Sequence, residues 1–143
     1  MDAQIRKICY PNGQLRSETP LVDGIPHGVA RDYYPNGQLA AEIPFLHGKR
    51  HGIARNWAAD GRLLGEYRME HGTGIVRLWY ENGQMSSEVP FLADQLCGRQ
   101  KSWDEKGERA ATLYWIRGRK VSRKKYLEAS VNDSELPKYP DKK

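Results

Sequence analysis

The sequence predicts an all-β fold, an elongated single-layer antiparallel meander of about five β-hairpin repeats closed by a short C-terminal helix. Two linked series of turns carry this prediction. The first lies at Asn12-Gly13, Asn36-Gly37, Asp60-Gly61, Asn82-Gly83 and Lys106-Gly107, with spacings of 24, 24, 22 and 24 residues. The second follows eleven residues after each of these glycines, at Gly24, Gly48, Gly72, Asp94 and Gly118. Two turns per unit of this length mean two short strands per unit, which is typical of stacked hairpins rather than of a helical solenoid.

Within each unit, the strand after the first turn alternates apolar and polar residues, which predicts a strand with one buried face. In the second unit the apolar positions are Leu39, Ala41, Ile43 and Phe45. A mostly aromatic stripe lies four residues before each turn glycine, at Cys9, Tyr33, Trp57, Trp79 and Trp103. We interpret this stripe as part of the sheet core rather than as a base-stacking platform of the kind that single-strand binders use.

The first turn leaves two strand registers open. A two-residue turn at Asn36-Gly37 would place Arg31 opposite Glu42. The same spacing would place a basic residue opposite a glutamate in most other units. A three-residue Pro-Asn-Gly loop, with the glycine in the left-handed bulge position, shifts the register by one residue. Val29 and Tyr33 then join the apolar face. We favour the bulged turn, because burial of a continuous aromatic stripe outweighs exposed ion pairs worth under ~1 kcal/mol each.

The C-terminal segment lacks strand alternation. Ser122 is a suitable helix N-cap, and Tyr126 and Leu127 can face inward. A short helix here would cover an otherwise open edge strand, as the ends of repeat arrays require. The predicted organisation is therefore a repeat array over residues 1–120, a capping helix over residues 121–131 and a flexible tail over residues 132–143, which is rich in Pro, Asp and Lys.

Charge and hydropathy bear on the partners and the cellular location of the protein. The formal net charge is +5, but six of the nine residues from Arg117 to Lys125 are basic, while the repeats carry interspersed charge of both signs. This basic segment is interpreted as a solvated face; attachment to anionic lipid or nucleic acid is the alternative. The N-terminal residues contain no apolar signal region, and no stretch approaches the ~18 apolar residues of a membrane span, so a cytoplasmic location is expected.

The sequence contains no recognisable catalytic or metal-binding constellation. The histidines cluster at the second turns, where a turn role accounts for them without a metal; they are His27, His47, His51 and His71. Cys9 and Cys97 lie far apart with no metal-like spacing. No paired nucleophile and base and no phosphate-binding loop is present. We therefore expect a protein without enzymatic activity, cofactor, metal or small-molecule substrate.

The segment from Gly48 to Gly52 reads Gly-Lys-Arg-His-Gly, with Phe45 before it and a tryptophan plus Asp60-Gly61 after it. This pattern resembles the MORN repeat. The Asn-Gly-Gln-Leu and Glu-x-Pro-Phe motifs of the other strands resemble the bacterial MORN-variant repeat, and chains of this kind are grouped as antitoxins of YwqK-type toxin-antitoxin systems. The resemblance covers about residues 8 to 120. It departs from the pattern in unit three, which is two residues shorter, so a bulge or a break in curvature is expected near the middle of the sheet.

The resemblance implies an antitoxin or immunity protein that neutralises a cognate bacterial toxin by direct steric binding. A stacked sheet without a catalytic site presents a long surface with one variable side chain per repeat, which is typical of a protein-binding module. Aromatic and arginine side chains carry most interface energy, and truncating the best of them costs ~2 kcal/mol or more. The predicted partner-binding residues are Tyr34, Arg55, Trp57, Arg77, Trp79 and Tyr80. The competing interpretation is that Trp57 and Trp79 only hold the sheet together.

Overall fold

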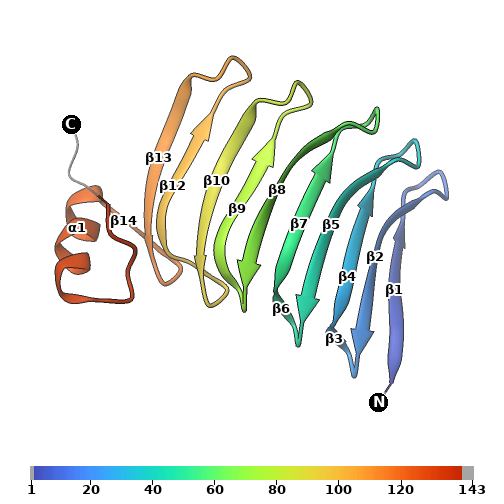
Figure 1. Ribbon diagram of the computed structural model, residues 1–143, viewed down its shortest axis with the longest axis horizontal. Helices are drawn as coiled ribbons and strands as arrows, with labels where there is room; N and C mark the ends of the chain where they lie inside the picture. The colour runs from blue at the N-terminus through green and yellow to red at the C-terminus, as the bar shows by residue number, and fades with distance from the viewer. Residues whose placement is uncertain (1, 140–143) are drawn as a thin grey trace.

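The computed structural model describes residues 2–139, which form one open antiparallel sheet followed by one helix (Figure 1). This confirms the predicted fold class. The long strands are β1 (Ala3–Cys9), β2 (Leu15–Val22), β4 (Gly28–Tyr33), β5 (Leu39–Leu46), β7 (Gly52–Trp57), β8 (Leu63–Glu70), β9 (Thr73–Trp79), β10 (Met85–Leu92), β12 (Gly98–Trp103) and β13 (Arg109–Ile116). The short strands are β3 (Ile25–Pro26), β6 (Lys49–Arg50), β11 (Gln95–Leu96) and β14 (Arg119–Val121), and the helix is α1 (Arg123–Asn132).

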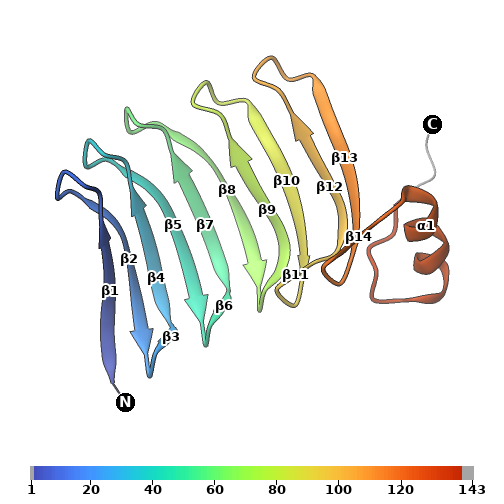
Figure 2. The same ribbon diagram turned by 180° about the vertical axis from the view of Figure 1, so that it is seen from behind.

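Each long strand pairs with the next one along the chain, so the sheet grows in sequence order from β1 to β13. Figures 1 and 2 show the two faces of this single layer, with β1 at one end and α1 at the other. Over the central repeats of residues 2–139, neither face carries a second layer. No helix among these residues is long and apolar enough to cross a membrane.

The first turn of each unit forms the three-residue loop that the Pro-Asn-Gly motif predicts. In the second unit Gly37 has a φ of 89°, its N–H donates to the Tyr34 carbonyl over 2.9 Å, and the Tyr34 N–H donates to the Gln38 carbonyl over 2.9 Å. A left-handed φ is readily adopted only by glycine, which explains why this position holds glycine in every unit.

The predicted strand register, however, is wrong: Arg31 lies directly opposite Glu42. A second bulge, between Asp32 and Tyr33, moves the register back by one residue beyond the turn. The same shift occurs in each of the other four first-turn hairpins, between β1 and β2, β7 and β8, β9 and β10, and β12 and β13. Two bulges per hairpin therefore restore the pairing that a two-residue turn would have produced.

This register defines two faces. The first, which we call the ladder face, carries a row of alternating charges across the strands; it comprises Lys7, Glu18, Arg31, Glu42, Arg55 and Glu66 and continues with Arg77, Glu88 and Lys101. Arg31 and Glu42 approach to 3.0 Å, and Arg77 and Glu88 to 3.2 Å. These half-exposed pairs set the register more than they add stability, because each contributes under ~1 kcal/mol.

The opposite side, which we call the apolar face, holds the core of the central repeats. Its buried residues are Ala54, Tyr67, Met69 and Val76, and Ile43, Trp79, Val89 and Phe91 pack against them. Because the sheet is a single layer, these side chains are covered only by their neighbours on the same face. The core is therefore thin and runs across the strands instead of filling a globular interior.

Unit three differs from the others as the shortened sequence predicts. In the first, second and fourth units, a short strand and a left-handed glycine interrupt the chain after the second turn, whereas β9 runs unbroken from Thr73 to Trp79. Trp79 lies across Gly65 of the preceding strand, where a methyl group would come within 2.2 Å of its Cζ2 atom. Gly65 therefore provides the space that the Trp79 ring occupies.

Helix α1 begins after Ser122, whose hydroxyl accepts from the Lys125 N–H over 3.1 Å. Tyr126 is fully buried against the last hairpin. The tail differs from the flexible segment expected from residue 132 onward, because Leu136 is only 2% exposed and Tyr139 packs against the sheet. Composition alone missed these two anchors among polar residues. Residues 140–143 of the predicted tail lie outside the described part of the chain.

Candidate protein-binding surfaces

The six residues predicted to bind a partner are all half-buried and do not form one patch. Arg55 and Arg77 belong to the charged row of the ladder face. The Arg55 Nε atom lies 3.0 Å from Glu66, and the Arg77 Nε atom lies 3.2 Å from Glu88. Both guanidinium groups thus have partners within the sheet. Their contact with another protein stays a prediction.

The two tryptophans differ in their surroundings. Trp79 packs against the buried cluster of Tyr67, Met69 and Val76 and crosses Gly65. Trp57 offers its backbone carbonyl to the Tyr34 hydroxyl over 2.8 Å. For Trp79, the structure supports a role in sheet packing, as the competing interpretation proposes.

Tyr34 and Tyr80 connect successive repeats through their hydroxyl groups. The Tyr34 hydroxyl donates to the Trp57 carbonyl, and the Tyr80 hydroxyl donates to the Trp103 carbonyl, both over 2.8 Å. The Tyr10 hydroxyl makes the equivalent bond to Tyr33 over 2.6 Å. In the first, second and fourth units, one tyrosine therefore joins the first-turn end of the unit to the next unit.

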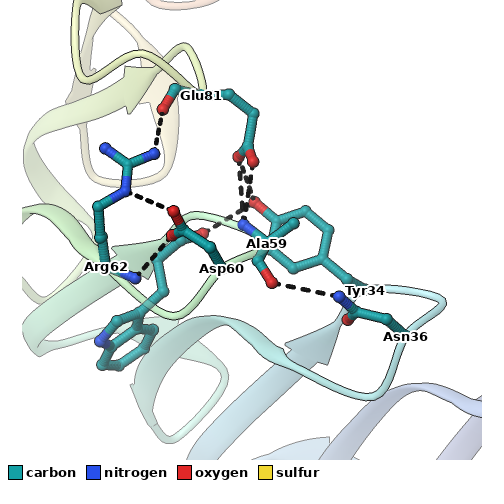
Figure 3. Close-up of polar contacts among 7 residues, drawn as sticks. Tyr34, Asn36, Ala59, Asp60, Arg62 and Glu81 are labelled. Carbon is teal, nitrogen blue, oxygen red and sulfur yellow. Dashed lines mark hydrogen bonds and ion pairs between the residues drawn. The ribbon is translucent and has the colours of Figure 1, made fainter.

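Unit three lacks this tyrosine, because Ala58 occupies its position. Figure 3 shows that Glu81 supplies a different connection there. The Glu81 carboxylate accepts from the Ala59 N–H over 3.0 Å, and its carbonyl accepts from Arg62 over 2.9 Å. Arg62 also pairs with Asp60 over 2.7 Å. A charged turn thus replaces the tyrosine bond where the repeat is irregular.

We expect Tyr80→Phe to lower the free energy of unfolding by about 1 kcal/mol, since it removes one hydrogen bond to a backbone carbonyl and keeps the ring. Equilibrium urea denaturation measures this loss. Tyr114→Phe is the matched control, because no hydrogen bond of the Tyr114 hydroxyl is seen in residues 2–139. Equal stability of Tyr80→Phe and the unchanged protein would contradict a connecting role for the hydroxyl.

The histidines perform a similar task at the second-turn end. The Nδ1 atom of His27 accepts from the His47 N–H over 3.2 Å, and that of His51 accepts from the His71 N–H over 3.0 Å. Their ring centroids lie 4.9 Å and 4.3 Å apart within each pair. These contacts agree with the predicted turn role. No group of three metal-ligating side chains is found among residues 2–139.

The apolar face is hollowed over the central repeats. A cavity of about 300 Å³ is lined by apolar side chains that include Ile43, Tyr67, Val76, Leu78 and Phe91. A second hollow of about 280 Å³ adjoins it and shares Arg50 and Phe91. The Arg50 Cζ atom lies 5.8 Å from the centre of the Phe91 ring, so its guanidinium stands between the two hollows.

Besides Arg50, the polar side chains of Asn56 and Asp32 line the first hollow. The Asn56 Oδ1 atom is buried and has no hydrogen-bond partner among the described residues. Desolvation raises the pKa of Asp32 above its usual value, and Arg16 partly offsets this effect. A buried acceptor without a partner carries an energetic cost that a donor from a ligand can remove. The sequence prediction missed Asn56 and Leu78, because their placement on this face depends on the second bulge.

The basic C-terminal segment is partly neutralised within the chain. The Arg117 guanidinium donates to Asp133 over 2.8 Å and to Glu135 over 2.9 Å. These contacts hold the pKa of Asp133 below its usual value. Arg117 thus holds the C-terminal segment against the second turn of the fifth unit through these ion pairs. Less positive charge is therefore left to bind an anionic surface.

Comparison with known families agrees with this architecture. The family model of the MORN repeat variant matches residues 26–47 and 73–93. These ranges contain most of the β4–β5 hairpin and of the β9–β10 hairpin, respectively. No curated protein and no solved structure gives a significant match. The matched hairpins support a MORN-repeat protein, which suggests a non-enzymatic repeat module.

Proposed function

We propose that the protein is an antitoxin or immunity protein that neutralises a cognate bacterial toxin in the cytoplasm by direct steric binding. MORN-type repeats support the coarser function of a non-enzymatic binding module. The family resemblance of the repeat motifs supports the finer one.

The hollow on the apolar face carries this proposal. It is open, predominantly apolar and placed at the middle of the array, and it contains the unpaired Asn56 carbonyl oxygen. A desolvated apolar centre with a few polar groups is typical of the energetic centre of a protein interface. An inserted apolar side chain of the toxin, flanked by a donor to Asn56, fits this surface.

The surface is preformed. Tyrosine hydroxyls connect the repeats at the first-turn end, and the histidine and backbone bonds connect them at the second-turn end. A sheet whose repeats are connected at both turn edges binds a partner with little rearrangement. Such a protein protects by occupying the toxin, so one molecule neutralises one toxin molecule.

We expect Leu78→Asp to weaken toxin binding at least tenfold, because it places a charge in the hollow that would be desolvated on binding. The fold tolerates this change, since the equivalent positions in earlier units are Asp32 and Asn56. The measurement is rescue of growth by co-expression with a candidate toxin, sought among the products of the neighbouring reading frames, together with the stoichiometry of the complex by calorimetry.

Ile53→Asp is the matched control, because Ile53 is a similarly exposed strand residue on the ladder face, 36% against 42% for Leu78. It should change toxin affinity less than twofold. Protection by substoichiometric amounts of the protein would imply turnover and overturn the proposal. The alternative, attachment to anionic lipid or nucleic acid through residues 117–125, requires binding that weakens steeply with salt.

A further inference from the structure

An apolar row crosses the ladder face beside the charged row, towards the second turns. It consists of Pro20, Val29, Pro44 and Ile53 and, beyond Arg68 of β8, of Ile75 and Pro90. Val29 lies opposite Pro44, and Ile75 lies opposite Pro90. Ile53 and Ile75 are among the exposed large apolar side chains of the sheet. The row begins at the open end of the array and leads to the surface that the C-terminal segment covers.

The C-terminal segment shows what this row can bind. Tyr139 lies over Pro90 and Gly98, and its hydroxyl accepts from the Arg99 N–H over 2.8 Å. A methyl group on Gly98 would lie 2.7 Å from the Tyr139 hydroxyl oxygen and 3.1 Å from the Pro90 Cβ atom. The Arg99 Cζ atom lies 4.2 Å from the centre of the Tyr139 ring. Pro90 and Gly98 are buried as a result.

The same backbone arrangement occurs twice more on this face. Gly28 and Gly52 have φ values of 116° and 120°, close to the 123° of Gly98. A methyl group on Gly28 would lie 3.3 Å from Pro20, and one on Gly52 would lie 2.9 Å from Pro44. Yet these prolines and glycines are only half-buried, because the C-terminal segment covers the far end of the row.

The residues after these glycines make the two sites more apolar than the covered one. Val29 and Ile53 stand where Arg99 stands in the last unit. Their backbone N–H groups stand at the position of the Arg99 N–H, which donates to the Tyr139 hydroxyl. In each site, one backbone N–H group thus lies among a proline ring, a glycine and a β-branched residue. Unit three has no such site, because Arg68 replaces the proline and two residues are missing.

We propose that the Pro20–Gly28 and Pro44–Gly52 sites bind tyrosine side chains of an extended segment from a partner protein, as the Pro90–Gly98 site binds Tyr139. The proposal continues an interface that the chain already makes with itself. It concerns the ladder face and stands apart from the toxin-binding hollow of the opposite face.

The geometry also fixes the spacing of the tyrosines. The sites lie on β2 and β5, which are two steps apart in the order β2-β4-β5. Two steps of about 4.8 Å place them roughly 10 Å apart. A chain in the polyproline II conformation has three residues per turn and rises about 3.1 Å per residue, so residues three apart lie on the same side, about 9 Å from each other. The partner segment therefore carries two tyrosines three residues apart and crosses the strands along the row.

The test uses the full chain, labelled with ¹⁵N, and a capped synthetic peptide Leu-Pro-Lys-Tyr-Pro-Lys-Tyr, which extends the sequence of residues 136–139. Titration followed by NMR should shift the amide signals of Val29 and Ile53. A peptide with both tyrosines replaced by alanine should bind at least tenfold more weakly. Replacement by phenylalanine should weaken binding severalfold, since only the hydroxyl acceptor is lost.

Variants of the protein locate the site. Ile53→Asp should weaken the peptide at least tenfold, and Ile53→Thr, which keeps the β-branched shape, should weaken it less. Leu78→Asp, on the opposite face, should leave peptide affinity within twofold. Shifts confined to Arg99 and its neighbours would mean displacement of Tyr139 alone and would overturn the inference. So would unchanged peptide binding by Ile53→Asp. Either result leaves the toxin test at Leu78 unaffected.

Discussion

Tyr126→Ala is expected to lower the free energy of unfolding by about 3–5 kcal/mol, the range for removing a large buried ring. Tyr126 is fully buried against Cys97, Tyr114 and Leu136. Its ring centre lies 5.5 Å from that of Tyr114 and 5.7 Å from that of Tyr139. The buried residues of helix α1 are Tyr126 and Ser130, and only Tyr126 has a large apolar side chain, so the tyrosine is its main anchor.

Urea denaturation followed by tryptophan fluorescence measures this loss, and hydrogen exchange locates it. Amides of β12, β13 and α1 should lose protection first, because neighbouring repeats contact only one another. Tyr126→Phe is the control: it keeps the ring and removes the 2.7 Å bond to the Pro137 carbonyl, at a cost of about 1 kcal/mol. Equal losses in both variants would show that the hydroxyl, rather than the ring, holds the helix.

The repeat period was sufficient to predict the fold, because it reports the strand-turn unit directly. Two glycine-marked turns per unit leave room only for hairpins, and the left-handed φ of Gly37 explains why the period is visible at all. Ser122 likewise predicted the start of the helix, because an N-cap residue bonds to a backbone N–H only a few residues along the chain.

The register could not be predicted in this way. The bulge between Asp32 and Tyr33 has no glycine to mark it, and it reverses the shift that the turn introduces. The ion pair of Arg31 with Glu42 was the available signal, recurring at the same spacing in three units. The ~1 kcal/mol value of such a pair misled the prediction, because a repeated pair selects between registers even where each copy adds little stability.

The binding surfaces were harder to predict than the fold. Tyr34 and Tyr80 are of a residue type that is common in protein interfaces. Their hydroxyls, however, bond to the backbone of the next repeat. Only the three-dimensional stacking of repeats shows which carbonyl each hydroxyl meets. The hollow around Asn56 and Leu78 depends on the same stacking. Residue type identified candidates, whereas neighbouring repeats decided whether they were free to bind.

Gly65→Ala is expected to lower the free energy of unfolding by about 1–3 kcal/mol, the cost of inserting a methyl group into an occupied space. The new Cβ atom would lie 2.2 Å from Trp79 Cζ2 and 2.6 Å from its Cε2, so the indole ring has to move. Gly65 lacks the left-handed φ of the turn glycines, so the cost is steric rather than conformational. Other units hold alanine or serine at this position, at Ala41, Ser87 and Ala111 among others.

A double-mutant cycle separates the two possible roles of Trp79. In a Trp79→Leu background the clash is absent, so Gly65→Ala should cost less than ~0.5 kcal/mol or stabilise slightly by restricting the unfolded chain. Urea denaturation of the four proteins measures the coupling. An unchanged cost in both backgrounds would contradict direct contact between Gly65 and Trp79.

If Trp79 is a partner contact instead of a core residue, Trp79→Leu should leave stability nearly unchanged and abolish neutralisation. The burial of the ring against Tyr67, Met69 and Val76 predicts the opposite order of effects, with stability lost first.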